Sequence, residues 1–275
     1  MVRKRMIELR DFSKSYAAAG IRGLFSSDYR TAARNVLAVR TVSFTAEAGR
    51  PTVLLGPNGA GKTTIIRAIA GLHYASAGSV VVSAAPRVSL VSPSAPLFDV
   101  CRAPKAARAM IGFVPERPIL YDDMTVSELL LTVAQFRGVT AAAVPDTVRC
   151  TLTQTALSAV QDKKIKTLSK GYVQRLMLAQ AVVATPPNIV LDEPTNGLDP
   201  AEISRLRQLV STLSKTQTVV LSTHVLSEAA ALDPNIVIVL NGTIVAQGRS
   251  DDIIARTQTA TLEDAYLALT GGGYA

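Results

Sequence analysis

The stretch from Gly56 to Thr63 places the tightest limit on what this chain can fold into. It reads Gly-Pro-Asn-Gly-Ala-Gly-Lys-Thr, follows the apolar run Thr52–Leu55, which we expect to be a buried strand, and leads into a predicted helix from Lys62 to Ala70. Strand, glycine-rich turn and helix in this order are the context of a phosphate-binding loop. Glycines let backbone N–H groups approach a polyphosphate, and the positive end of the helix dipole adds to the attraction. The sequence therefore predicts a nucleotide-binding site.

Individual positions of this loop have distinct expected roles. Lys62 is expected to reach the β- and γ-phosphates of ATP, and the hydroxyl of Thr63 is expected to bind Mg²⁺. A chance match in a glycine-bearing turn is the alternative, and the flanking strand and helix signals argue against it. The further positions predicted to bind the nucleotide are Gly56, Asn58, Gly59, Ala60, Gly61 and Thr64.

Two adjacent carboxylates, Asp192 and Glu193, end the apolar run Asn188–Leu191. Strand periodicity points them to opposite sides, so the two groups need not do the same job. Asp192 suits the Mg²⁺ shell, and Glu193 suits a base that polarises an attacking water molecule. A solvated strand end with two acids is the alternative, which the phosphate-binding loop disfavours.

Residues 168–172, Leu-Ser-Lys-Gly-Tyr, resemble the LSGGQ signature of ABC ATPases, including its LSKGY-type variants. Their spacing ahead of the two carboxylates also resembles that of the family, and the resemblance extends from about Ile7 to Gly248. It implies an α/β P-loop NTPase fold with a RecA-like core, an antiparallel β subdomain and a helical subdomain. We expect a single domain over residues 1–250, a helical subdomain inserted at about 118–167, and a short C-terminal extension over 251–275.

The resemblance also implies how the signature works. Ser169 and the backbone of Gly171 would begin a helix that runs through Ala184 and would cap the γ-phosphate held by an opposite subunit. The site is then complete only in a head-to-tail dimer with a second copy or a related ATPase. Lys170 replaces the first glycine of the signature and Tyr172 replaces the glutamine, but Ser169 and Gly171 are kept.

Four further positions resemble functional residues of the family. His224 resembles the switch histidine that contacts the γ-phosphate, and Asp199 resembles the D-loop aspartate that links the two sites of the dimer. Tyr16 resembles the aromatic residue that stacks on adenine, with a packing role beside a strand as the alternative. Glu116 stands where many members have glutamine, and its carboxylate can bind Mg²⁺ but cannot donate a hydrogen bond. The predicted catalytic residues are Lys62, Glu193, Asp199 and His224, and the predicted metal ligands are Thr63, Glu116 and Asp192.

The rest of the chain alternates strand-like apolar runs with helix-like segments, which favours an α/β architecture. Thr125 and Glu128 predict a capping box at the start of a helix in the helical insert. Residues 241–242, Asn-Gly, predict a tight β-hairpin. Two stretches, 17–35 and 83–105, are expected to be loops or insertions.

Composition limits the kind of protein further. Hydrophobic residues make up 48% of the 275 residues, yet no unbroken apolar stretch reaches the roughly eighteen residues of a membrane-spanning helix. The net charge of +8 indicates either solubility alone or attraction to nucleic acid or to an anionic membrane surface. No compact basic run with interleaved aromatic residues occurs, so we expect no nucleic-acid partner. A peripheral protein on the cytoplasmic face of a membrane is the prediction.

The family resemblance implies that an integral membrane permease is a separate chain that docks on the helical insert. Leu120, Tyr121 and Met124 are candidate contacts, and core packing is an equal alternative for them. The segment around Glu116 and the LSKGY-type signature resemble exporter subunits. ATP hydrolysis that drives export is therefore the expected function.

Two other functions would use part of the same motif set. A soluble ABC-type ATPase acting on ribosomes or DNA would share these motifs. However, ribosome-acting relatives carry two ATPase halves in one chain, and DNA-repair relatives carry a long coiled coil, whose heptads are absent ahead of Ser169. A small-molecule kinase would leave Ser169, Gly171 and His224 without a use.

Overall fold

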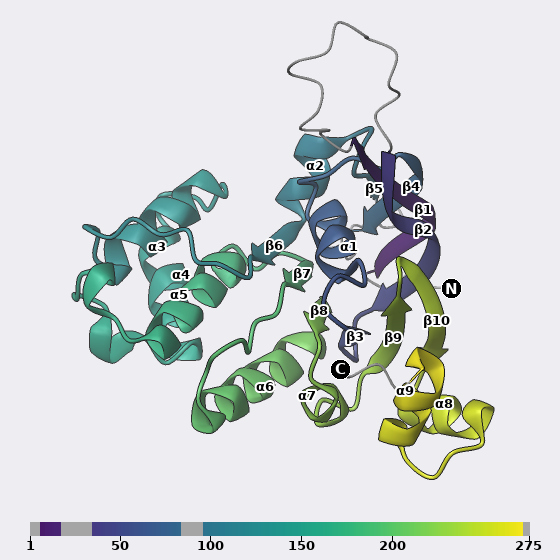
Figure 1. Cartoon of the computed structure of the whole chain (residues 1–275). Helices are drawn as coiled ribbons and strands as arrows, with labels where there is room; N and C mark the ends of the chain where they lie inside the picture. The colour runs from purple at the N-terminus through teal and green to yellow at the C-terminus, as the bar shows by residue number, and fades with distance from the viewer. Residues whose placement is uncertain (1–5, 18–34, 84–95, 272–275) are drawn as a thin grey trace, which may run out of the picture.

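The computed structural model describes residues 6–17, 35–83 and 96–271, which form two sheets and an array of helices (Figure 1). The smaller sheet is antiparallel with the strand order β2-β1-β4-β5. Its strands are β1 (Met6–Ala17), β2 (Asn35–Glu47), β4 (Ala77–Ser83) and β5 (Leu97–Asp99).

The larger sheet has the strand order β10-β9-β3-β8-β7-β6 and is parallel except for β10. All four residues of β3 and of β7 are buried, as expected for parallel strands that are covered on both faces. Its strands are β3 (Thr52–Leu55), β6 (Ile111–Val114), β7 (Asn188–Leu191), β8 (Thr218–Thr223), β9 (Asn235–Leu240) and β10 (Thr243–Gly248).

Helix α1 (Lys62–Ile69) lies between the two sheets, where Ile65, Ile66 and Ile69 join one hydrophobic core with side chains of both sheets. The opposite face of the larger sheet is covered by a second core. That core draws on α5 (Lys170–Val182), α6 (Pro200–Ser214) and α7 (Leu226–Ala230). The α/β fold with an antiparallel β subdomain is thus confirmed.

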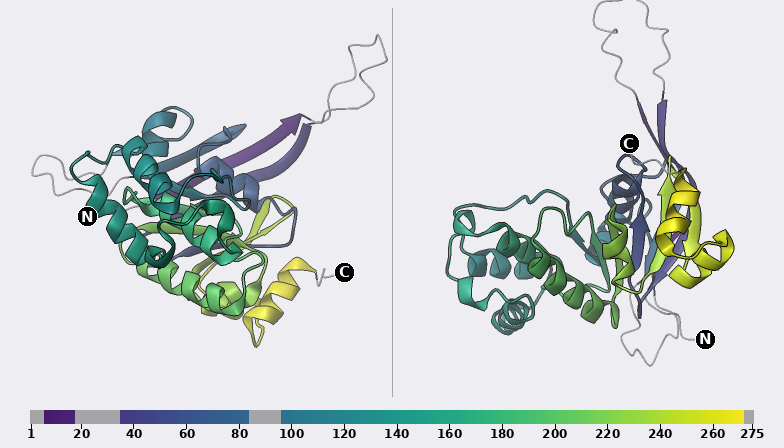
Figure 2. Two further views of the ribbon diagram at one scale, coloured as in Figure 1. Left: turned by 90° about the vertical axis from the view of Figure 1, so that its left-hand side faces the viewer. Right: turned by 60° about the horizontal axis from the view of Figure 1, so that its bottom comes forward.

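The helical part projects from the edge of the larger sheet beyond β6 and β7 (Figures 1 and 2). It contains α3 (Val126–Phe136) and α4 (Val144–Gln154), and it has a third hydrophobic core. Helix α5 belongs to both parts, because Leu176 packs into the third core while Met177 packs into the second. This helix was expected to run through Ala184 and ends at Val182.

Two local predictions are confirmed. Thr125 accepts a hydrogen bond from the Glu128 amide, and the Glu128 carboxylate accepts one from the Thr125 amide, which makes a capping box. Asn241 and Gly242 have φ values of 48° and 76° between β9 and β10, as a tight hairpin turn requires.

Of the predicted loop or insertion over residues 83–105, residues 84–95 lie outside the described residues, and from residue 96 onward the stretch is not an irregular loop. Strand β5 extends the antiparallel sheet, and α2 (Pro104–Ala109) begins within this stretch. Three residues are too few to show a strand period, and a proline at the first helical position resembles a loop signal. Of the predicted insertion 17–35, residues 18–34 lie outside the described residues.

Two helices follow β10, α8 (Ser250–Thr257) and α9 (Leu262–Thr270). Both helices lie beside β9 and β10 (Figure 1). Ile253 and Tyr266 are almost fully buried in the second core, so these helices share the core of the main domain.

Candidate functional site

The phosphate-binding loop connects β3 to α1 and holds its lysine in a defined place. Lys62 is 5% exposed, and its Nζ donates hydrogen bonds to the carbonyl oxygens of Gly56 at 2.7 Å and Pro57 at 3.1 Å. Gly61 has a φ of 105°, a left-handed conformation that favours glycine. The strand and the loop thus set the position of the ammonium group before the first turn of the helix.

A cavity of about 390 Å³ opens at this loop. Glu116 after β6, Glu193 after β7 and His224 after β8 reach it from the carboxyl ends of neighbouring strands. Ligands of open α/β sheets bind at this edge. The cavity is lined by Ala38, Asn58, Gly59, Ala60, Gly61, Lys62, Thr63, Thr64, Glu116, Glu193, Asn196 and His224.

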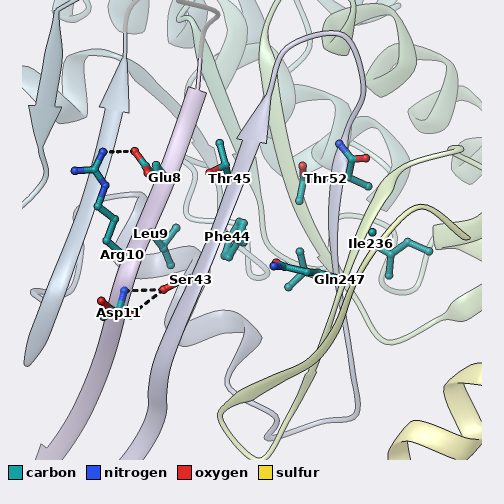
Figure 3. A pocket seen from close by; sticks show the side chains of 13 residues that line it. Glu8, Leu9, Arg10, Asp11, Ser43, Phe44, Thr45, Thr52, Ile236 and Gln247 are labelled. Carbon is teal, nitrogen blue, oxygen red and sulfur yellow. Dashed lines mark hydrogen bonds and ion pairs between the residues drawn. The ribbon is translucent and has the colours of Figure 1, made fainter. Parts of the chain in front are cut away.

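A larger hollow of about 680 Å³ lies elsewhere, between β1 and β2 on one side and β9 and β10 on the other (Figure 3). Its charged groups have partners within the fold. Arg10 pairs with Glu8 at 2.6 Å, and Asp11 accepts a hydrogen bond from Ser43 at 3.1 Å. None of the predicted site residues lines this hollow, so the cavity at the phosphate-binding loop is the candidate site.

Asp192 is 1% exposed and lies directly behind this cavity. Its Oδ1 accepts hydrogen bonds from the hydroxyls of Thr63 at 3.1 Å and Ser222 at 2.8 Å. Burial raises the pKa of Asp192 above its ordinary value, and the nearby charge of Glu116 acts in the same direction. Oδ2 is buried and has no hydrogen-bond partner among the described residues. A free carboxylate oxygen beside the Thr63 hydroxyl is the hard oxygen donor set that Mg²⁺ prefers.

Glu193 bridges the lysine and the histidine of the cavity. Its Oε1 lies 3.3 Å from Nζ of Lys62, and its Oε2 lies 2.9 Å from Nδ1 of His224. Its backbone N–H donates to the hydroxyl of Ser222 at 2.9 Å. Lys62, Glu193 and His224 thus form one contact chain, and their catalytic roles stay a prediction.

The expectation that Asp192 and Glu193 point to opposite sides is wrong. Strand β7 ends at Leu191, and Glu193 has a φ of 44°, so strand periodicity no longer applies to this residue. Both carboxylates therefore contact the first turn of α1, Asp192 through Thr63 and Glu193 through Lys62.

The predicted adenine-stacking residue lies apart from these groups. Tyr16 is on β1 and does not line the cavity. Its ring meets the ring of His73 edge to face at 5.7 Å, and Nζ of Lys14 lies 5.2 Å from the ring centre. Stacking of Tyr16 on adenine stays a prediction.

The signature residues lie outside the cavity formed by the phosphate-binding loop of the same chain. Ser169 is the exposed N-cap residue of α5 and makes no capping hydrogen bond. Asp199 caps α6 by accepting a hydrogen bond from the Glu202 amide at 2.9 Å. A Cβ added to Gly171 would lie 2.9 Å from Cγ of Glu202, so the start of α5 packs tightly against the start of α6.

Lys170, one of the two departures from the family signature, lies next to the D-loop, the turn of residues 194–199 that ends at Asp199. Its Nζ would be 2.0 Å from a Cβ added at Gly197, which has a φ of 68°. Glycine at position 197 therefore provides both the backbone conformation and the space that this lysine occupies.

Three residues at the site were not predicted. Ala38 and Asn196 line the cavity, and Ser222 binds both consecutive carboxylate residues. Ser222 precedes Thr223-His224 at the end of β8, so its place next to β7 is a consequence of strand pairing. No local sequence signal marks these positions.

Comparisons with known proteins show which family this chain resembles. Residues 39–196 match the family model described as ABC transporter. The Nod factor export ATP-binding protein I of Burkholderia lata is 36% identical over 219 residues, which are 79% of this chain and 68% of that protein. An ABC transporter ATP-binding protein of Bacillus subtilis is 32% identical over 81% of this chain and 69% of its own length. The chain thus spans about two thirds of the length of these relatives.

Solved structures are similar over nearly the whole chain. One is described as an ATP-binding subunit of an ABC transporter, with a TM-score of 0.78 and 27% identity over 96% of this chain and 99% of that one. A dimeric ATP-binding cassette bound to ADP and phosphate has a TM-score of 0.69 at 22% identity, and this likeness concerns the fold alone.

The chain belongs to the ABC transporter family. Within it, the chain is an ATP-binding subunit that hydrolyses ATP to drive transport. No helix of the residues described here is long and apolar enough to cross a membrane.

Proposed function

We propose that this chain is the ATPase motor of an exporter, that it works as a head-to-tail dimer, and that it acts on a separate membrane permease at the cytoplasmic face. The observation that carries the proposal is the contact chain from Lys62 through Glu193 to His224. It joins a phosphate-binding cation, a base and an orienting histidine within one cavity.

The cavity residues then have separate tasks in hydrolysis. Lys62 binds the β- and γ-phosphates, Glu193 accepts a proton from the attacking water, and His224 orients that water against the γ-phosphate. Thr63, Asp192 and Glu116 would hold Mg²⁺, which would neutralise phosphate charge. The raised pKa of Asp192 fits this task, because a cation would compensate a buried carboxylate whose Oδ2 has no hydrogen-bond partner among the described residues.

Dimerisation follows from where the signature lies. Ser169 and Gly171 do not line the cavity at the phosphate-binding loop of their own chain, and they lie at the start of α5, where Ser169 is exposed. An exposed helix N-terminus with an unused hydroxyl suits a phosphate group held by a second copy. Asp199 and Lys170 belong to the same surface and would contribute to that interface.

Permease docking is supported by exposed apolar side chains of the helical part, two of them before α3 and one at the end of α3. Ile119 is 85% exposed, Tyr121 is 70% exposed and Phe136 is 87% exposed. Of the three residues predicted as contacts, only Tyr121 is free for this role, because Leu120 and Met124 pack against the hydrophobic cores. Export is supported by the exporter ATPases among the relatives and by Glu116 in the cavity.

Size-exclusion chromatography with light scattering tests the dimer. Glu193→Gln should bind ATP without turnover, so Mg²⁺-ATP should convert a monomer into a stable dimer. A second change, Ser169→Arg, should keep nucleotide binding and abolish the dimer, and omission of Mg²⁺ should reduce its formation. A Glu193→Gln variant that hydrolyses ATP at the normal rate would refute the assignment of the base.

A further inference from the structure

Glu228 on α7 connects two loops that meet at the cavity, although the residue itself does not line it. Its Oε2 accepts hydrogen bonds from the hydroxyl of Thr195 and, at 3.2 Å, from the hydroxyl of Thr223. Thr195 comes from the loop after β7, and Thr223 is the last residue of β8. One carboxylate oxygen therefore ties these two loops together.

The hydrogen bonds of Thr223 fix the backbone on both sides of His224. Thr223 is 1% exposed, and its hydroxyl also accepts a hydrogen bond from the Val225 amide at 3.0 Å. His224 thus sits in a short turn whose two ends are held by one side chain. That turn directs Nδ1 of His224 to Glu193.

Thr195 belongs to the D-loop, which begins directly after Glu193. The turn is closed by hydrogen bonds from the Asn196 amide to the Glu193 carbonyl at 3.2 Å and from the Leu198 amide to the Thr195 carbonyl at 3.1 Å. A change in the D-loop would therefore move Thr195 against Glu228. Two hydrogen bonds to one carboxylate oxygen make this a short and direct connection.

We propose that Glu228 is a positioning residue that sets the orientation of His224 and couples it to the D-loop. The proposal rests on the function proposed above for His224. Its consequence is that contact of a second subunit with the D-loop changes the position of the histidine through Thr195, Glu228 and Thr223. Glu228 touches neither nucleotide nor water in this scheme and acts through its neighbours.

Histidine-selective NMR tests the connection without any need for activity. The chain has two histidines, His73 and His224, so a His73→Gln variant assigns both signals. Glu228→Ala should shift the imidazole signals of His224 and leave those of His73 in place. Thr195→Val should do the same, although Thr195 does not touch His224. Imidazole signals of His224 that coincide with the wild type in both variants would overturn the proposal.

Two further variants separate positioning from mere stability. Glu228→Gln keeps an acceptor oxygen and should restore the signals of His224 toward the wild type. Glu8→Gln removes a charge on β1, far from α7, and should change nothing at His224. Thermal unfolding of each variant shows whether it is folded. If Glu228→Ala does not fold, Thr195→Val decides the test.

Steady-state hydrolysis gives the functional readout. Thr195→Val and Glu228→Ala should lower kcat by roughly tenfold to a hundredfold, as expected for a misplaced group, and should change KM by less than about twofold. The double variant should lose no more than the stronger single variant, because both act through one connection. If both single variants had a normal kcat while His224→Ala was inactive, the inference about Glu228 would be refuted and the proposed function would stand. Normal kcat in His224→Ala would overturn the proposed function itself.

Discussion

We predict that Asp192→Asn makes the protein more stable and abolishes its activity, because the carboxylate of Asp192 is buried. Asp192→Asn would keep the oxygen that accepts hydrogen bonds from Thr63 and Ser222, and it would remove a charge whose second oxygen has no partner among the described residues. An unsatisfied buried polar group costs about 1–3 kcal/mol, and a charged one costs more. The new amide group would also lack a partner, so we expect this substitution to raise the free energy of unfolding by about 1–2 kcal/mol near neutral pH.

The pH dependence of stability tests separately whether Asp192→Asn raises the free energy of unfolding. Burial raises the pKa of Asp192, so the unfolded chain releases this proton at a lower pH than the folded chain does. The stability that protonated Asp192 provides is therefore present below its ordinary pKa and is lost as the pH rises through its raised pKa. The difference in stability between Asp192→Asn and the wild type should grow over that range and then level off.

Urea unfolding in a chelator-containing buffer without nucleotide, between about pH 4 and about pH 8, measures this difference. Asp251→Asn, at an exposed position of α8, is the matched control and should show no such growth. The same Asp192→Asn preparation should have lost Mg²⁺-dependent hydrolysis. A variant that is no more stable than the wild type near neutral pH, or a difference that does not change with pH, would refute the reasoning.

Three other predictions concern the scaffold and the nucleotide. Gly242→Ala should lower the free energy of unfolding by about 1–3 kcal/mol in urea titrations, because the φ is 76° and the added Cβ would lie 2.6 Å from the Ala38 carbonyl oxygen. Thr125→Ala removes the capping box with Glu128 and should cost about 1 kcal/mol by thermal unfolding, with hydrolysis unchanged. Tyr16→Ala should weaken ATP binding by up to about tenfold in calorimetry, whereas Tyr16→Phe should bind normally, because stacking needs only the ring.

The features that the sequence predicted well are those encoded within a few neighbouring residues. The phosphate-binding loop, the capping box at Thr125 and the hairpin at Asn241 each need particular residue types at fixed short distances. Each of these features can therefore be recognised from a short stretch of the sequence. The two carboxylates after β7 were recognised in the same way, since they directly follow an apolar strand.

The features that the sequence did not predict depend on residues far apart in the chain. Ser222 contacts Asp192 because β8 pairs with β7. The side chain of Lys170 lies next to Gly197 because the start of α5 lies beside the D-loop. The direction of Glu193 was missed because its left-handed backbone is a property of a turn that no single residue type specifies. Such contacts follow from the assembled fold.

The hairpin between β9 and β10 has a consequence for how this protein matures. The Gly242 amide donates a hydrogen bond to the Ala60 carbonyl at 2.9 Å, and the Gly242 carbonyl accepts one from the Arg40 amide at 2.7 Å. Strand β3, which leads into the same loop, pairs only with β8 and β9 among the described strands. The phosphate-binding loop thus gains its full set of backbone contacts only after β8, β9 and β10, which come much later in the chain, have been synthesised. We expect a chain that is truncated before this hairpin to lack these contacts and to bind ATP more weakly than the full chain.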